Sequence, residues 1–212
     1  MKIEQILIGN MAVFCYLISC PETKEALIID PAGNEEMLAA KIKTQGLTLK
    51  YIVNTHGHAD HTGGNAKMKA LTNALTAIHK DDNAIFTSPP AQAMAKQMGF
   101  DTFPPADITL SDGDLLKIGK VTLTVVHTPG HTPGGICLLG EGNLFTGDTL
   151  FVGGIGRTDL PFSSHTQFMN SIREKLLTLP DNTIIWPGHD YGPAPSSTIG
   201  LEKKLNPWLR SA

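Results

Sequence analysis

The chain has 212 residues, with 17 Lys and Arg against 20 Asp and Glu, and a formal net charge of −3 at pH 7. This mildly acidic balance contains no basic block, which excludes a surface that follows a phosphate backbone, so no nucleic-acid partner is expected. The length is sufficient to bury a core as one domain over residues 1–212.

The N-terminal stretch, MKIEQILIGNMAVFCYLISC, is interrupted by Glu4 and Asn10. It therefore lacks the unbroken apolar run of a signal peptide or of a membrane span. Three scattered cysteines do not form a disulfide framework, and they are expected to be half-buried strand residues. These features predict a cytoplasmic protein without membrane attachment.

Short runs rich in β-branched residues predict strands at 13–19, 26–30, 49–56, 121–127 and 183–189. A helix is expected from the cap Asn34 to Gly46, and another begins at a Ser164-x-x-Gln167 capping box and stops before Pro180. The Pro-rich stretches at 88 to 107 indicate an exposed connection. This order is typical of an α/β protein, with either one doubly wound sheet or two sheets with helices outside.

Four of the short apolar runs lead directly into polar turns that contain glycine. YIV precedes THGHADH, LTVV precedes HTPGH, LF precedes TGD, and IIW precedes PGH. Because turns after neighbouring strands project side chains into a common space, we expect seven metal-binding residues to meet at one edge of the sheets. These residues are His56, His58, Asp60, His61, His131, Asp148 and His189. A catalytic zinc takes about three protein ligands, so this number fits two ions better than one.

The other histidines are given weaker roles. His79 is expected at the surface or beside a helix, and His127 is either a partner that orients a ligand or part of turn packing. His165, in the first turn of a helix, is either solvated or close to substrate.

Taken together, THGHADH, HTPGHTPG, FTGDTLF and PGH resemble the motifs of the metallo-β-lactamase superfamily, in the same order and over nearly the whole chain. The resemblance implies a four-layer αβ/βα sandwich with the metals at one edge, between the two sheets. It also implies a ligand set: His56, His58 and His131 on a first metal, Asp60, His61 and His189 on a second, and Asp148 bridging the two.

Within that superfamily the chain is most similar to the hydroxyacylglutathione hydrolases, or glyoxalase II enzymes, through the segment FTGDTLFVGGIGR. Typical members carry a separate C-terminal helical domain with basic glutathione-binding residues, and this sequence shows none after His189. GRTD at 156 to 159 and the segment HDYGPAPSSTIGLEKKLNPWL resemble the persulfide dioxygenases equally well. Those enzymes hold a single iron through the equivalents of His56, His131 and Asp148.

The expected function is a metal-dependent hydrolase that cleaves a thioester such as an S-hydroxyacylglutathione through a metal-bound hydroxide. Asp60 and Asp148 are its catalytic candidates, and its cofactors are two divalent ions, zinc by preference, with iron or manganese as alternatives. The other reading is a mononuclear iron dioxygenase acting on glutathione persulfide.

Two residues are candidates for contact with the small-molecule substrate. Arg157 either anchors an anionic group or pairs with Asp159, and Tyr191 either lines the pocket or packs beside it. The sequence does not distinguish a monomer from a homodimer.

Overall fold

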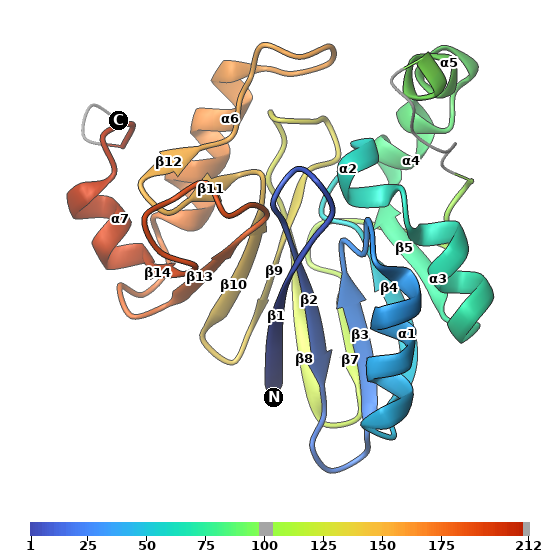
Figure 1. The fold of residues 1–212 in the computed structure, drawn as a ribbon. Coiled ribbons are helices and arrows are strands. Elements are labelled where there is room, and N and C mark those ends of the chain that lie inside the picture. Colours follow the sequence, from blue (N-terminus) through green and yellow to red (C-terminus); the bar gives the residue numbers. More distant parts are fainter. Residues whose placement is uncertain (98–103, 210–212) are drawn as a thin grey trace.

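Two six-stranded sheets lie face to face and carry helices on their outer faces (Figure 1). The computed structural model describes residues 1–97 and 104–209. The four layers confirm the predicted αβ/βα sandwich, because the strands divide between two sheets and do not form one doubly wound sheet.

The first sheet has the strand order β1-β2-β3-β4-β5-β6. Its strands are β1 (Lys2–Ile8), β2 (Val13–Ser19), β3 (Glu25–Ile29), β4 (Thr48–Val53), β5 (Leu75–His79) and β6 (Ile108–Leu110). Strands β3 to β6 are parallel, so each pair needs a crossover connection, which helices supply. These helices are α1 (Glu35–Thr44), α2 (Ala59–Thr62), α3 (Asn65–Thr72), α4 (Lys80–Phe86) and α5 (Pro89–Gln97).

The second sheet has the strand order β14-β13-β10-β9-β8-β7 and is antiparallel except for the pair β10 and β13. Its strands are β7 (Leu115–Ile118), β8 (Val121–His127), β9 (Ile136–Gly140), β10 (Asn143–Gly147), β13 (Ile184–Pro187) and β14 (Ser197–Thr198). A small hairpin of β11 (Leu150–Phe151) and β12 (Gly154–Ile155) follows β10. The outer helices are α6 (His165–Ser171), the π-helical turn η1 (Ile172–Leu176) and α7 (Ile199–Leu205).

Strand β2 shows why the apolar runs are continuous. Phe14, Tyr16 and Ile18 pack into the core between the sheets, whereas Cys15 and Leu17 pack under α1 and α3. A strand covered on both faces has no place for alternating polar residues. The expectation of half-buried cysteines is therefore wrong, since Cys15, Cys20 and Cys137 are all fully buried.

The predicted helix ends are partly right. Ser164 Oγ accepts a hydrogen bond from the Gln167 amide, which is one half of the predicted capping box. The other half is replaced, because the Ser164 amide donates to the Gly130 carbonyl, and the helix continues past Ser171 as the π-helical turn η1. Asn34 precedes α1 but does not cap it, because its backbone is left-handed (φ 58°) and its Oδ1 accepts from the Gly9 amide.

The expected exposed connection at 88 to 107 contains helix α5. This helix begins at Pro89, a position where a missing N–H costs nothing. The part of the prediction that concerns residues 98–103 lies outside the described residues.

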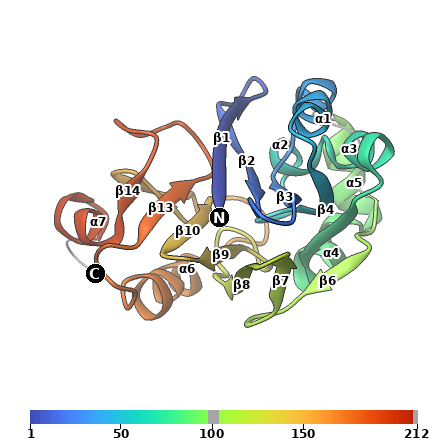
Figure 2. The ribbon, with the colours of Figure 1, turned by 90° about the horizontal axis from the view of Figure 1, so that it is seen from below.

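The two sheets are joined at the edge where the ligand-bearing turns meet. The Ile136 amide donates to the Thr55 carbonyl at 2.8 Å, and the Phe14 amide donates to the Gly188 carbonyl at 2.8 Å. Figure 2, seen from below, shows β1 and β2 as the part of the first sheet that lies next to β10 and β13 of the second. These links fix the turns of one sheet against those of the other. In the described part of the chain, no helix is long and apolar enough to cross a membrane.

Candidate metal centre

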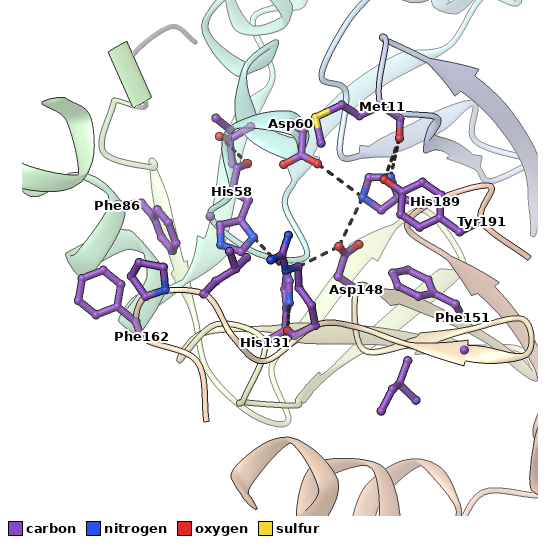
Figure 3. A pocket seen from close by; sticks show the side chains of 18 of the residues that line it. Met11, His58, Asp60, Phe86, His131, Asp148, Phe151, Phe162, His189 and Tyr191 are labelled. Carbon is purple, nitrogen blue, oxygen red and sulfur yellow. Dashed lines mark hydrogen bonds and ion pairs between the residues drawn. The ribbon is translucent and has the colours of Figure 1, made fainter. Parts of the chain in front are cut away.

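All seven predicted ligands come together at this edge, from the four turns that follow β4, β8, β10 and β13. Figure 3 labels five of them: His58, Asp60, His131, Asp148 and His189. The turn after β4 supplies His56 and His58, and the short helix α2 supplies Asp60 and His61. His131, Asp148 and His189 follow β8, β10 and β13. Their ligand atoms form three groups, each within 4.8 Å: His56, His58 and His131; His56, His61 and Asp148; Asp60, His61 and His189.

Asp148 lies between the two halves of this cluster. Its Oδ2 is 3.4 Å from His189 Nε2 and 3.6 Å from His131 Nε2, and its Oδ1 is 3.4 Å from His61 Nε2. Oδ1 is also buried without a hydrogen-bond donor. A carboxylate in this position faces both groups of imidazoles at once.

In four of the histidines, a hydrogen bond to the outward ring nitrogen determines which nitrogen faces the cluster. Nδ1 of His189 lies 2.9 Å from the Met11 carbonyl oxygen, and Nδ1 of His131 lies 2.8 Å from the Arg157 carbonyl oxygen. A carbonyl only accepts, so both Nδ1 atoms carry the proton and both Nε2 atoms present lone pairs. A histidine held in this way is oriented as a metal ligand.

Asp30, a buried residue at the end of β3, orients the other two. Its carboxylate lies 3.0 Å from His61 Nδ1 and accepts from the Thr55 hydroxyl at 2.7 Å. Because that hydroxyl donates to Asp30, its oxygen is left to accept from His56 Nδ1 at 3.1 Å. His56 and His61 therefore also direct Nε2 inward, and His56 Nε2 is buried without a partner.

Inward nitrogens approach one another closely. His61 Nε2 is 3.1 Å from His189 Nε2, and His131 Nε2 is 3.0 Å from His58 Nδ1. Two lone pairs at this distance repel unless a cation or a shared proton lies at the same place. Neutral imidazoles with carboxylates are suitable ligands for zinc or iron, so the donor set fits a divalent metal.

The protonation of the cluster agrees with this fit. Burial lowers the pKa of His56 and lowers that of His58 to about 4, with neighbouring imidazoles adding to the effect. Burial also opposes charge on His61, but Asp148 and Asp30 outweigh it and raise the pKa of His61 to about 10. Asp148 is ionised because His61 and His189 lower its pKa against the effect of burial. The raised pKa places an extra proton on His61, at a position where a bound cation would replace it.

Asp82, which the sequence reasoning missed, joins two of the ligand turns. This buried residue of α4 accepts hydrogen bonds from the Gly57 amide at 2.8 Å, the Thr132 hydroxyl at 2.7 Å and the Gly134 amide at 2.5 Å. Gly57 lies between His56 and His58, and Thr132 follows His131. One carboxylate therefore sets the spacing of the first group of histidines.

The sequence-family model described as Metallo-beta-lactamase superfamily matches residues 8–189 of the chain. The chain belongs to the metallo-beta-lactamase superfamily. Two curated relatives represent the two activities that the sequence resembles. The hydroxyacylglutathione hydrolase GloC of Haemophilus influenzae is 39% identical, over 100% of this chain and 99% of the relative. The mitochondrial persulfide dioxygenase ETHE1 of Mus musculus is 33% identical, over 98% of this chain and 75% of the relative.

Solved structures of the superfamily superimpose closely on the chain. The BLEG-1 B3 metallo-beta-lactamase matches with a TM-score of 0.88 and 36% identity, covering 98% of this chain and 99% of that one. TTHA1623 in a di-iron-bound form matches with a TM-score of 0.84 and 31% identity, covering 97% of this chain and 100% of that one.

The two predicted substrate residues lie beside the cluster and line the same cavity. The Arg157 guanidinium is exposed and forms a fork with Asp159, with N–O distances of 2.7 and 2.8 Å. The Tyr191 ring stacks on His189 at 4.4 Å, and its hydroxyl donates to the same Met11 carbonyl that His189 contacts. Tyr191 therefore supports a histidine of the cluster in addition to lining the cavity.

The remaining histidines lie apart from these seven residues. His79 is buried, so its expected surface position is wrong, while its place beside a helix is confirmed because it caps α4. His127 stacks on it at 4.0 Å with an angle of 13° and lies 2.9 Å from the Pro133 carbonyl oxygen. Although His79, Asp81 and His127 come within metal-binding distance, ring nitrogens in two parallel stacked planes do not point at one ion. His165 lies 3.1 Å from the Thr158 hydroxyl.

Proposed function

We propose that the chain is a metal-dependent thioester hydrolase of the glyoxalase II type, acting on a substrate such as an S-hydroxyacylglutathione. The observation that carries this proposal is the position of Asp148 between two groups of inward-facing donors. In this assignment His56, His58 and His131 hold one divalent ion, Asp60, His61 and His189 hold the other, and Asp148 bridges them. The 39% identity to a hydroxyacylglutathione hydrolase supports the assignment.

Bound there, two divalent ions would activate a water near neutral pH and polarise the thioester carbonyl. The residues of the chain prepare that chemistry. Met11, Arg157 and Asp30 hold the outer nitrogens of the histidines through hydrogen bonds, so the ligands need no rearrangement. Asp60 lines the cavity and lies 3.5 Å from His189 Nε2, and in a form with only the first metal its carboxylate would instead be free to accept a proton from water.

Departure of the thiol product needs no further catalytic group. A thiol has a pKa near 8.5, so the thiolate leaves without a strong general acid. The described residues of the cavity include no serine or cysteine that would act as a nucleophile.

A second candidate is the mononuclear iron persulfide dioxygenase. His56, His131 and Asp148 lie in the same cluster, and two histidines with one carboxylate leave open positions on an iron for oxygen and substrate. The 33% identity to ETHE1 supports this alternative. It predicts that Asp60, His61 and His189 contribute little to binding the metal.

The two functions are separated by assaying one preparation for both reactions. Thiol release from S-lactoylglutathione is measured with a chromogenic disulfide, and oxygen consumption is measured with glutathione persulfide. The hydrolase predicts thiol release and no oxygen uptake, and both the activity and the metal are lost in Asp148→Ala. Oxygen uptake without thioester cleavage would overturn the proposal in favour of the dioxygenase.

A further inference from the structure

The cavity beside the metal cluster has a volume of about 620 Å³, a size typical of small-molecule sites. His58, His131, Asp148 and His189 lie on its lining, so whatever fills it also meets the reacting centre. In Figure 3, Phe86 and Phe162 lie on the His58 side, and Met11, Phe151 and Tyr191 lie on the His189 side. Apolar side chains thus flank the cluster on both sides.

The exposed aromatic side chains of the described residues gather at this cavity. All three of the large aromatic residues that are exposed in the described part of the chain, Phe162, Tyr191 and Trp208, line this cavity. Met11 and Met94, also exposed, line it as well. Clustered apolar exposure costs solvation free energy, and it marks surfaces that bind an apolar group.

Phe162 is unfavourable for a second reason, which is backbone strain. Its backbone is left-handed (φ 70°), a conformation that is unfavourable for a bulky side chain, and its residue is 60% exposed. Asn or Gly would adopt this backbone without strain, and either would be better solvated. A strained and exposed aromatic ring at the mouth of a site indicates a binding role.

Phe86 extends the apolar surface to the metal ligands. Its ring packs edge-on against the His58 ring, with centroids 5.4 Å apart. It also lies directly over Gly57, where an added Cβ would come within 2.0 Å of the Phe86 ring. We call Phe86 and Phe162 the aromatic wall.

Neither the one basic side chain of the cavity nor the aromatic wall favours a polar acyl group. Arg157 is the only Lys or Arg among the described lining residues, and its guanidinium is held by Asp159. The aromatic wall offers no hydrogen-bond donor, so an acyl hydroxyl placed against it would lose water without a replacement.

From these observations we infer that the preferred substrate carries an extended apolar acyl chain, which binds along the aromatic wall. This inference rests on the proposed hydrolase function and specifies its substrate class. Short acyl groups, the lactoyl group included, are then cleaved with a lower kcat/KM than long apolar ones, because they leave the wall exposed to water.

The test uses the Zn²⁺-loaded protein and a series of glutathione thioesters that differ only in the acyl group: lactoyl, acetyl, butanoyl, hexanoyl and octanoyl. Each methylene that becomes fully buried in the transition state raises kcat/KM about fourfold. Allowing for partial burial, we expect kcat/KM to rise by roughly tenfold or more from acetyl to octanoyl, with lactoyl no better than acetyl.

Phe162→Asn assigns the effect to the wall, because asparagine tolerates the left-handed backbone and the variant is expected to fold at least as stably as the wild type. The octanoyl-to-acetyl ratio of kcat/KM should fall by about tenfold in this variant. Lys24→Asn is the matched control, since Lys24 is also exposed and left-handed (φ 61°) but lies in the turn between β2 and β3. It should leave the ratio unchanged.

The possible failures are distinguishable. If no thioester of the series is cleaved, the proposed hydrolase function fails, and this inference fails with it. If thioesters are cleaved but kcat/KM is flat or falls with chain length, only the inference is overturned. An unchanged ratio in Phe162→Asn would likewise overturn the assignment to the aromatic wall.

Discussion

Replacing Asp82 by asparagine is expected to weaken metal binding at the His56, His58 and His131 group without unfolding the protein. The carboxylate Oδ2 accepts from the Gly57 amide and the Thr132 hydroxyl, and Oδ1 accepts from the Gly134 amide. Asparagine has the same shape but only one oxygen. Whichever way the amide is turned, its NH₂ group meets at least one buried N–H donor.

The size of the effect follows from that unpaired donor. A buried hydrogen-bonding group left without its partner costs about 1–3 kcal/mol. Part of that cost is relieved when the turns carrying His58 and His131 move apart, which disturbs the spacing of the ligands. Removing a group that orients metal ligands typically costs about 10–100-fold in affinity, and we expect a loss in this range.

The measurement is competition for zinc between the protein and a chromophoric chelator, for the wild type and Asp82→Asn. Asp81→Asn is the matched control, because it removes the same charge from the neighbouring residue, whose side chain is about half exposed. We expect the control to bind zinc like the wild type. If Asp82→Asn also binds both ions with wild-type affinity, the reasoning that Asp82 sets the ligand spacing is refuted.

Three further predictions concern other residues. Asp148→Ala should abolish activity and lower the metal content, because no other carboxylate faces both groups of donors in the described structure; retention of activity would contradict a bridging role. His189→Ala should reduce thioester hydrolysis as severely as it reduces occupancy of the second metal, and a variant with one metal and near wild-type hydrolysis would contradict the two-metal assignment. Burial and the neighbouring His127 lower the pKa of His79 from 6.5 to about 4. Between these pH values the unfolded chain binds a proton that the folded chain does not, so stability falls as the pH decreases from 6.5 to 4. His79→Asn replaces the ring nitrogen that caps α4 with an amide oxygen that also accepts at this position. The variant should make the free energy of unfolding of the metal-free protein less dependent on pH in urea titrations at pH 7 and 5; an unchanged dependence would contradict this account.

The ligands could be predicted from the sequence because each follows a strand within a few residues. Strand, glycine-containing turn and histidine or aspartate are all local features, and the edge of a sheet brings such turns together. His56, His58, Asp60 and His61 are also too close in sequence to lie far apart. The same local patterns located the main strands and two of the helices.

The supporting residues could not be predicted, because their contacts join distant segments. Asp30 and Asp82 lie at the start of connections, in sequence contexts that resemble ordinary helix and turn signals. Only the packing of the sheets shows that each reaches a ligand turn. His79 is a similar case, since its burial depends on stacking with His127 from the other sheet. The local sequence also gave a wrong prediction at Asn34, because the left-handed backbone there prevents the expected cap of α1.

The measurement that tests the central claim most directly is the metal content of the protein purified without added metal, determined by elemental mass spectrometry together with thioester hydrolysis by the same sample. The two-metal hydrolase predicts about two zinc-like divalent ions per chain and release of thiol from the thioester. One iron per chain, with oxygen consumed on glutathione persulfide and no thioester cleavage, would contradict it.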